Sequence, residues 1–189
     1  MVRFADDCLL CFNDFHDARR VMDVLPKRFA KWGLELHPDK TNLVNFRNPD
    51  RWDNPDRLRS ETFDFLGFTH FWHKSYKNSY YIKRKTAKDR LSRSLRKISD
   101  WCRKHRHLKI KYQHKKLSQM LHGHCAYFGV YGNSRRVAAF FYFSRRIWFK
   151  WLKRRSRLRS LNWVQFQRIL DRYRLPNARI VHKYNLVKL

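Results

Sequence analysis

The distribution of charge along the chain constrains its fold more than any other feature of the sequence. Residues 71–189 contain 33 Lys and Arg residues and only three acidic residues, Asp89, Asp100 and Asp171. Residues 1–70 are nearly neutral, with 11 basic and 12 acidic residues. Because three carboxylates cannot pair with so many cations, the basic side chains must form a surface that repels itself unless a polyanion neutralises it. A nucleic-acid backbone is the leading candidate, ahead of a solvated charged face or an anionic membrane.

The apolar content is nevertheless high enough to build a core. Of the 189 residues, 43% are hydrophobic, and 7 Trp, 9 Tyr and 15 Phe supply large side chains for packing. A disordered basic tail is therefore excluded, because disordered segments are poor in aromatic residues. The length allows one large domain or two small ones.

No segment of the sequence is suited to cross a membrane. The longest stretch without Lys, Arg, Asp or Glu covers residues 117–134 and still contains two His, one Gln and one Asn, whereas a transmembrane helix needs about 20 apolar residues. The N-terminus lacks a basic segment followed by an apolar one, so no signal peptide is predicted. We therefore expect a cytoplasmic, reducing compartment and free thiols at Cys8, Cys11, Cys102 and Cys125.

The first third of the chain mixes helical and strand patterns. Apolar residues at helical spacing over residues 16–32 predict a helix that is capped by Asn13 or Asp14, kinked at Pro26 and ended by Gly33. The other expected elements here are a turn at 37–39, a strand over 43–46, a loop over 47–61 and a hairpin formed by strands 63–72 and 79–83.

Beyond residue 86 the apolar spacing becomes helical. The expected helices cover residues 86–105, 112–128, 134–157 and 162–173, with Gly123, Gly129 and Gly132 breaking or ending the second. In the third helix, apolar and basic residues alternate so that Val137, Phe140, Ser144, Ile147 and Trp151 share one stripe and Arg146, Lys150, Lys153 and Arg154 face away. The sequence thus predicts an α+β fold in two parts, residues 1–84 and a basic helical bundle over 85–189, with the boundary near 83–86.

Two adjacent carboxylates mark the start of the chain. The apolar runs at 2–5 and 8–12 predict a β-hairpin with Asp6 and Asp7 at its tip. Adjacent carboxylates repel each other, and a divalent cation such as Mg²⁺ relieves that repulsion because it prefers oxygen ligands. A plain turn is the alternative, since Asp is common in turns.

Four sequence blocks, in order, resemble a known family. Residues 2–7 (Val-Arg-Phe-Ala-Asp-Asp) resemble the Tyr-Ala-Asp-Asp block of the reverse transcriptase palm. Residues 33–41 resemble the next palm block, and 65–68 (Phe-Leu-Gly-Phe) resemble the primer-grip hairpin. The basic part resembles the maturase-specific, or thumb, domain of group II intron-encoded proteins at residues 121–129, 133–136, 145–148 and 175–182. The resemblance implies truncated palm hairpins in 1–84 followed by a helical-bundle thumb in 85–189.

The resemblance also assigns roles to individual residues. It implies that Asp6, assisted by Asp7, is a ligand in a site for two Mg²⁺ ions that perform nucleotidyl transfer. Lys40 matches a lysine proposed to protonate the leaving pyrophosphate, with a solvated turn lysine as the alternative. Residues Phe65, Leu66 and Gly67 would lie near the primer end. The cations that we expect to contact RNA are Arg135, Arg136, Arg145, Arg146, Lys150, Arg154 and Arg179.

The sequence departs from the family pattern in three respects. Phe4 stands where Tyr is usual, and Cys8 where a larger apolar residue is common. The fingers and first palm strands, which in the family carry a third metal-binding aspartate, have no counterpart in these 189 residues. We therefore expect this chain to be a C-terminal portion of such a protein and to lack polymerase activity alone.

A zinc site is a weaker prediction. Cys8 and Cys11 are spaced as a Cys-x-x-Cys pair, and His122, His124 and Cys125 are close in sequence. On a strand, however, positions 8 and 11 point to opposite faces. The alternative is that His122 and His124 pack between helices or donate to RNA phosphates.

Three functions remain open. The chain could belong to an RNA-directed DNA polymerase that acts in intron mobility, or it could act as a maturase that holds intron RNA in its splicing-competent fold. It could also be a stand-alone basic RNA-binding module with no catalytic role. The expected partners are group II intron RNA, primer and template nucleic acid, and a missing N-terminal reverse transcriptase portion, with no membrane partner.

Overall fold

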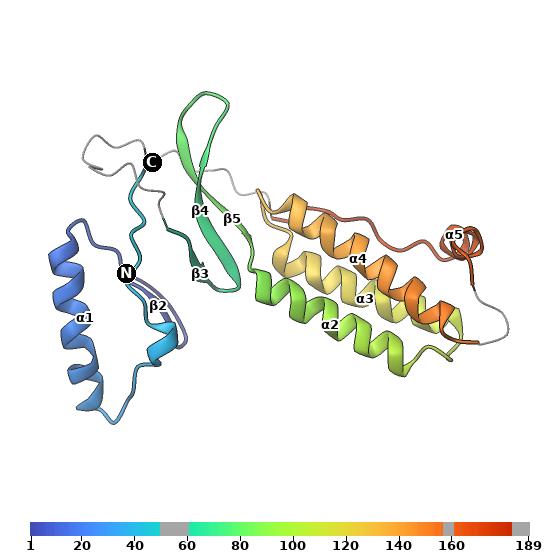
Figure 1. Cartoon of the computed structure of the whole chain (residues 1–189), viewed down its shortest axis with the longest axis horizontal. Coiled ribbons are helices and arrows are strands. Elements are labelled where there is room, and N and C mark those ends of the chain that lie inside the picture. The colour runs from blue at the N-terminus through green and yellow to red at the C-terminus, as the bar shows by residue number, and fades with distance from the viewer. Residues whose placement is uncertain (50–60, 157–160, 183–189) are drawn as a thin grey trace. The chain divides into compact units, whose positions relative to one another are not determined.

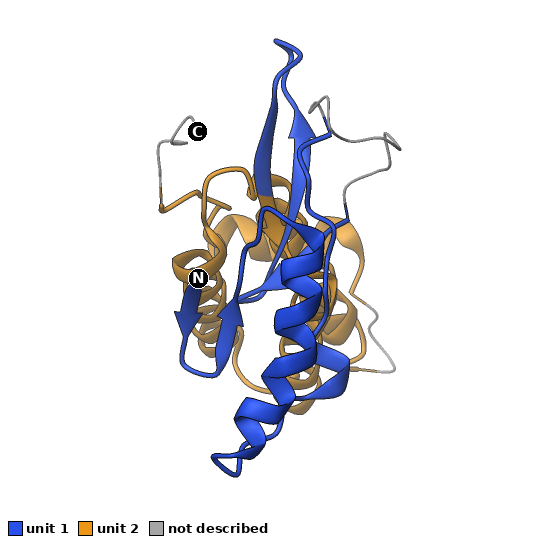
Figure 2. Ribbon diagram, turned by 90° about the vertical axis from the view of Figure 1, so that its left-hand side faces the viewer, with its two compact units in different colours: residues 1–83 blue, residues 84–189 orange. Residues whose placement is uncertain are grey.

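The computed structural model describes residues 1–49, 61–156 and 161–182. The chain divides into two compact units, Met1–Lys83 and Arg84–Leu189, which are coloured separately in Figure 2. The described part contains five α-helices and two small sheets (Figure 1), which confirms the α+β class. None of the described helices is long and apolar enough to cross a membrane.

The chain begins with a short antiparallel hairpin. Strand β1 (Val2–Phe4) pairs with β2 (Asp7–Leu9), with Phe4 opposite Asp7. The hairpin is confirmed, but its turn consists of Ala5 and Asp6, so the expected position of Asp7 at the tip is wrong. The turn lies one residue earlier because Ala5 adopts a left-handed backbone with φ of 50°, and this allows a two-residue connection.

Helix α1 (Phe15–Ala30) confirms the first predicted helix. Its N-cap is Asp14, whose side chain accepts hydrogen bonds from the backbone N–H groups of His16 at 2.7 Å and Asp17 at 3.1 Å. These backbone donors hold the pKa of the Asp14 carboxyl below its usual value, because they stabilise the charged form. The helix includes Pro26 and ends before Gly33, whose φ is 65°.

The expected strand over 43–46 is wrong. Pro38–Lys40 forms a short 3-10 helix in the predicted turn, and residues 41–48 have no regular secondary structure. The segment is held mainly by side chains: the Asn45 N–H donates to the Glu61 carboxylate at 2.7 Å, and the indole N–H of Trp72 donates to the Phe46 carbonyl at 3.1 Å. One backbone bond, from Glu61 N–H to the Asn45 carbonyl at 2.9 Å, does not make a strand ladder. The predicted loop 47–61 lies largely outside the described residues.

A three-stranded sheet replaces the predicted two-stranded hairpin. Strands β3 (Phe63–Phe65), β4 (Phe68–Lys74) and β5 (Tyr80–Thr86) lie in that order. The single strand predicted over 63–72 is therefore wrong. It is divided by a two-residue turn at Leu66 and Gly67, whose φ values of 49° and 77° fit the left-handed backbone of a tight hairpin.

The four predicted C-terminal helices are all present. They are α2 (Lys88–Lys104), α3 (Ile110–Phe128), α4 (Ser134–Lys153) and α5 (Trp163–Arg172). Gly129 caps α3, whereas Gly123 lies inside it, so the expected break at Gly123 is wrong. A Cβ at Gly123 would meet open space, so no close approach of another segment requires glycine at this position. The predicted end of the third of these helices at residue 157 is wrong, because α4 ends at Lys153 and Arg154 is its C-cap.

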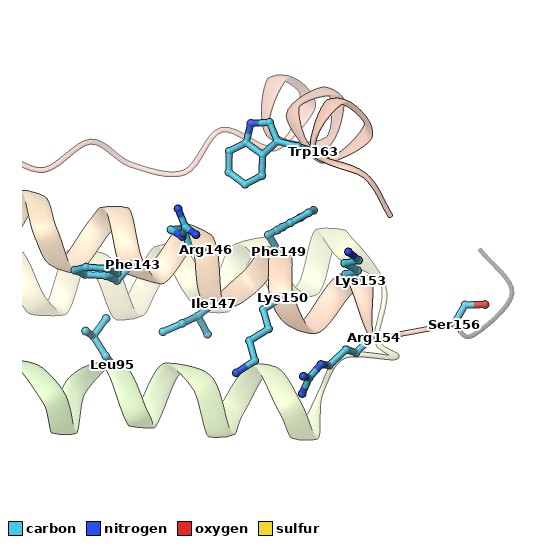
Figure 3. Close-up of a pocket in the computed structure, with 10 residues that line it drawn as sticks. All are labelled: Leu95, Phe143, Arg146, Ile147, Phe149, Lys150, Lys153, Arg154, Ser156 and Trp163. Atoms are coloured by element: carbon cyan, nitrogen blue, oxygen red, sulfur yellow. The ribbon is translucent and has the colours of Figure 1, made fainter. Parts of the chain in front are cut away.

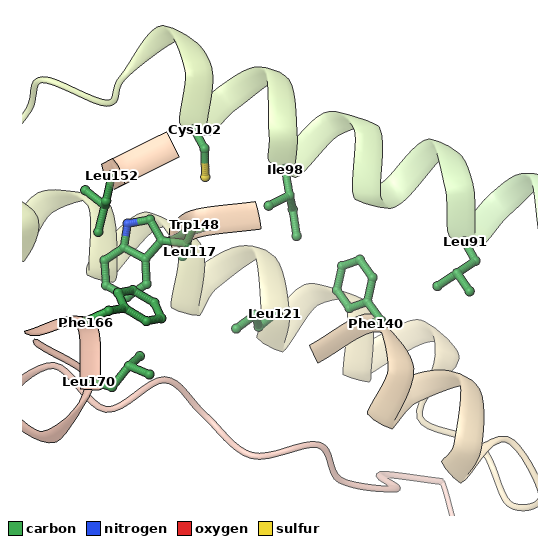
Figure 4. Packing of buried hydrophobic residues seen from close by; sticks show 10 residues of the cluster. All are labelled: Leu91, Ile98, Cys102, Leu117, Leu121, Phe140, Trp148, Leu152, Phe166 and Leu170. Carbon is green, nitrogen blue, oxygen red and sulfur yellow. The ribbon is translucent and has the colours of Figure 1, made fainter. Parts of the chain in front are cut away.

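One apolar core holds these helices together. Figure 4 shows Trp148 and Phe166 at one end of the cluster and Phe140 and Leu91 at the other. Helix α4 supplies the centre, because it packs mainly on α2 and also on α3. The buried stripe predicted for this helix is partly correct. Ile147 and Trp151 are only half-buried, because the buried residues after Phe140 follow at four-residue intervals. The buried residues of α4 are Val137, Phe140, Ser144, Trp148 and Leu152.

Two buried amides connect segments that are distant in sequence. The Asn133 side chain accepts from the Thr86 N–H at 2.8 Å and donates to the Thr86 hydroxyl at 2.7 Å and the Phe128 carbonyl at 2.8 Å. The Gln113 side chain accepts from the Trp148 indole N–H at 2.9 Å and donates to the Leu108 carbonyl at 2.8 Å. These bonds attach the start of α2 to the α3–α4 connection, and the α2–α3 connection to α4.

Candidate carboxylate hairpin and nucleic-acid interface

The two N-terminal aspartates lie on an exposed hairpin. Asp6 occupies the turn, Asp7 is the first residue of β2, and both are exposed. The turn itself is supported by the Arg3 Nε, which donates to the Ala5 carbonyl at 3.1 Å. Within the described residues, no ion pair joins Lys40 to either aspartate. Sequence matching therefore found these three residues, but the fold alone does not assemble them into a charged cluster.

The carboxylate pair does not by itself suit a two-metal centre. No group of three or more His, Cys, Asp or Glu side chains in the described part of the chain could hold a metal ion. Two exposed carboxylates supply only part of the oxygen donor set that magnesium ions require. The Cys and His side chains of the described residues form no such group either.

The predicted primer-grip residues form a well-defined turn. Phe65 and Phe68 face each other as the last pair of the β3–β4 ladder, and Leu66 with Gly67 connects them. The positive φ explains the glycine, because Gly67 adopts this backbone without strain, whereas it is uncommon for a residue with a side chain such as Leu66. These residues thus form a tight β-hairpin turn, and their role as a primer grip stays a prediction.

Six of the seven predicted RNA-contacting cations belong to α4 or its C-cap. Arg135 and Arg154 are 19 positions apart, which corresponds to about 29 Å along a helix. All are exposed except Arg136, which is half-buried, and Arg179 is exposed on the segment after α5. The structure therefore arranges these cations along one helix rather than in a single cluster. The six cations of α4 and its C-cap are Arg135, Arg136, Arg145, Arg146, Lys150 and Arg154.

These cations have no carboxylate partners among the described residues. The ion pairs found there involve only Asp89 and Asp100 of α2, which pair with arginines of the same helix. Arg146 instead donates to the Tyr142 hydroxyl at 2.8 Å and lies over that ring at 5.6 Å. The guanidinium of Arg154 lies 5.4 Å from the centre of the Trp151 ring. Aromatic faces thus orient these cations without cancelling their charge.

Several residues in the matched thumb blocks have structural roles. Asn133 and Trp148 are buried and hydrogen-bonded, as described above. His124 is buried, stacks on Phe140 with ring centres 3.6 Å apart, and has its pKa lowered to about 4 by burial. A neutral, buried imidazole cannot reach an RNA phosphate, so the phosphate-donor alternative is wrong for His124, whereas His122 is exposed.

The last described segment is fastened to the bundle. The N–H groups of Val181 and His182 both donate to the Gly129 carbonyl, at 2.7 and 2.9 Å. The Tyr131 N–H in turn donates to the His182 carbonyl at 3.1 Å, and the His182 Nε2 lies 2.7 Å from the Ala126 carbonyl. The segment that carries Arg179 is therefore held against the C-terminal end of α3.

Sequence reasoning missed a groove beside α4, which Figure 3 shows. Its volume is about 970 Å³, and it is bordered by α2 on one side and by the start of α5 on the other. Aromatic and aliphatic side chains line it together with four cations, and no acidic residue does. The alternation of apolar and basic residues over 140–155 indicated the part of this surface that α4 forms. It could not indicate Trp163, which lines the groove from another helix. The lining residues are Leu95, Phe143, Arg146, Ile147, Phe149, Lys150, Lys153, Arg154, Ser156 and Trp163.

The comparison with protein families bears on the first part of the chain. Residues 1–70 match the family model described as reverse transcriptase (RNA-dependent DNA polymerase). No curated protein and no solved structure matches this chain. The matched region contains the carboxylate hairpin, Lys40 and the β3–β4 turn, and it ends before the basic helices. The match therefore supports a relationship of this chain to the reverse transcriptase family.

Proposed function

We propose that this chain is the C-terminal portion of a group II intron reverse transcriptase/maturase and that its helical unit binds intron RNA to assist splicing. In the intact protein, the hairpin with Asp6 and Asp7 would contribute to RNA-directed DNA synthesis for intron mobility. The charge of the helical unit carries this proposal: residues 84–189 contain 30 basic and 3 acidic residues, a net charge of +27. The match of residues 1–70 to reverse transcriptases supports a polynucleotide as the anion that this charge attracts.

The helical unit is suited to bind RNA because its cations stand on a packed scaffold. Trp148 and Phe166 are fully buried and fix α4 and α5, so the exposed cations of α4 keep their spacing. A fixed array of cations loses little conformational freedom when phosphates bind. Each phosphate that is neutralised also releases counterions, which favours binding at low salt.

A salt titration tests the proposed RNA binding. The full chain should bind a group II intron transcript with an affinity that falls steeply between low and physiological salt, at a log–log slope of about −0.7 to −0.9 per phosphate contact. Replacing Arg145 and Arg146 with Gln should lower the slope by about 1.4 to 1.8 for two lost contacts. The double variant should melt like the wild type, because both side chains are exposed.

A matched pair of cations in the other unit provides the control. Lys27 and Arg28 are also adjacent and exposed on a helix, and replacing both with Gln removes the same charge from α1. We expect this control to change the slope far less. An affinity independent of salt, or equal effects of the two double variants, would refute the assignment of RNA binding to the helical unit.

The catalytic part of the proposal needs a longer protein. The full chain alone should extend no primer on an RNA template with Mg²⁺ or Mn²⁺, because it presents only two carboxylates of the expected site. In a protein extended by the upstream palm, Asp6→Asn should reduce DNA synthesis by orders of magnitude while assisted splicing continues. Primer extension by the chain alone, or loss of both activities in folded Asp6→Asn, would contradict this division of roles.

The alternative function is a stand-alone RNA-binding module with no catalytic role. The lack of a third metal-binding side chain near the aspartates, within the described residues, favours it. The two proposals differ in the effect of the aspartates in the extended protein. If extension with the palm restores no DNA synthesis, the stand-alone module is the better description.

A further inference from the structure

We propose that the groove beside α4 binds an unpaired nucleotide of the RNA, with the base on its aromatic side chains and the neighbouring phosphates on its cations. This inference rests on the proposed RNA binding and specifies where and how a single-stranded segment is held. The groove volume of about 970 Å³ is at the upper end of the roughly 300–1,000 Å³ typical of small-molecule sites. It therefore has room for a base with its sugar.

Two half-exposed aromatic side chains provide faces for the base. Phe143 is 45% exposed and Trp163 is 47% exposed, although both border the groove. Trp163 is held in place by Phe149, whose ring meets it edge-on at 5.0 Å, and by Phe166 at 5.4 Å. A capping box at Asn162 fixes the first turn of α5, from which Trp163 projects. The indole is thus positioned before any ligand binds, which lowers the entropic cost of stacking.

Four cations line the same groove. Arg146, Lys150 and Arg154 follow one another at four-residue spacing on α4, which places them about 6 Å apart along the helix axis. In Figure 3, Lys150 and Arg154 project from α4 on the side of α2. Lys153 also borders the groove, and no carboxylate pairs with these four cations among the described residues. The polar part of the ligand must therefore be anionic.

This combination favours an unpaired nucleotide over an RNA duplex. In a duplex the base faces stack on each other, so Phe143 and Trp163 would stay uncovered. An unstacked base offers a face to one of these rings, while the phosphates on either side of the base reach the cations. A lipid fits less well, because its single headgroup charge would leave most of the four cations unpaired beside an acyl chain.

The test measures binding of the full chain to three RNA probes of equal length. These are a single-stranded oligouridylate, the same strand with abasic positions that retain the phosphates, and a duplex. The wild type should bind the oligouridylate about tenfold or more tightly than the abasic strand, since stacking of one base contributes that much affinity. Phe143→Leu combined with Trp163→Leu should remove this difference and leave duplex binding unchanged. Tyr112→Leu, at a 54% exposed position on α3, is the matched control and should change none of the three affinities.

Several outcomes would overturn the inference. If the abasic and normal strands bind equally to the wild type, the groove does not bind the base and the inference is wrong. Salt-dependent RNA binding would in that case still support the proposed function. If the wild type binds no RNA at all, both proposals fail. If anionic phosphatidylglycerol vesicles bind in a manner that depends on Phe143 and Trp163 while the oligouridylate does not, the groove takes lipid.

A measurement on the wild type makes the test independent of variant folding. An oligouridylate that carries a photoreactive iodouridine should cross-link to the full chain, and peptide mass spectrometry should locate the cross-link at Phe143 or Trp163. Cross-links confined to other residues would contradict the proposal even if the double variant failed to fold.

Discussion

Replacing Asn133 with Ala should destabilise the helical unit strongly. Asn133 and Thr86 are 1% and 0% exposed, and the Asn133 side chain makes three hydrogen bonds to Thr86 and Phe128. Alanine leaves the Thr86 N–H buried without its partner, and one unsatisfied group costs about 1–3 kcal/mol. The Phe128 carbonyl loses one of two donors and keeps the Val130 N–H at 2.8 Å. Together with the two hydrogen bonds lost by the Thr86 hydroxyl and the Phe128 carbonyl, we expect a loss of about 2–4 kcal/mol in the free energy of unfolding.

Related substitutions separate the contributions at this site. Asn133→Asp keeps the acceptor for the Thr86 N–H but points a carboxylate oxygen at the Phe128 carbonyl, so it should destabilise at neutral pH at least as much as alanine. Thr86→Val keeps the shape and removes only the hydroxyl, which should cost about 1 kcal/mol. The control is Asn177→Ala, an exposed position, where we expect a change within about 0.5 kcal/mol.

The assay is urea unfolding of the full chain, followed by the far-ultraviolet helical signal. Helices α2 to α5 supply most of this signal, so it reports mainly on the helical unit. A loss below about 1 kcal/mol for Asn133→Ala would show that the buried amide does not hold the α3–α4 connection to the start of α2, since even one unsatisfied group should cost more.

Two further predictions concern α3. Gly129→Ala should lower stability by about 1–3 kcal/mol, because the added Cβ would lie 2.3 Å from the Cys125 carbonyl oxygen and 3.0 Å from that of Arg179. Gly123→Ala should raise stability by about 0.5–1 kcal/mol, because its Cβ meets open space. Thermal melting that shifted both variants in the same direction would contradict this pair of predictions. Burial lowers the pKa of His124 from 6.5 to about 4, so the unfolded state binds more protons in this range and stability should fall as pH decreases from 6.5 towards 4, at about 1.4 kcal/mol per pH unit. His124→Phe should lack this pH-dependent loss of stability. Parallel pH profiles of the unfolding free energy for the wild type and His124→Phe would refute the prediction.

The helices were predictable because their signal is local and repeated. The apolar residues of α2 to α5 recur at helical spacing over 10 to 20 positions, and the structure keeps these helices within a few residues of the predicted bounds. The centre of the α4 stripe was less certain, because Ile147, Trp148, Trp151 and Leu152 are all apolar. Contacts with Phe166 and Gln113, which the local pattern does not contain, decide that Trp148 is buried.

The strands and the polar contacts were less predictable because they depend on distant partners. The apolar residues at 43–46 suggest a strand, but Glu61 and Trp72 bind this segment through side chains instead. The buried roles of Asn133 and Gln113 join residues 47 and 35 positions apart, so no local pattern could reveal them. Exposed cations were easier to find, since a charge that lacks a nearby opposite charge remains at the surface wherever the chain folds.

The two units differ in how firmly they can position a functional side chain. Among the described residues of 1–83, only Ala18 and Phe68 are buried hydrophobic residues, whereas Phe4 beside the carboxylate turn is 64% exposed. Strands of three residues with exposed faces cannot hold carboxylates within the fraction of an ångström that metal chemistry needs. The cations of α4, in contrast, stand on a helix fixed by Trp148, Phe140 and Leu152. We therefore expect the proposed RNA binding to be measurable in this chain as it is, and the proposed catalytic role of the carboxylate hairpin to need additional packing.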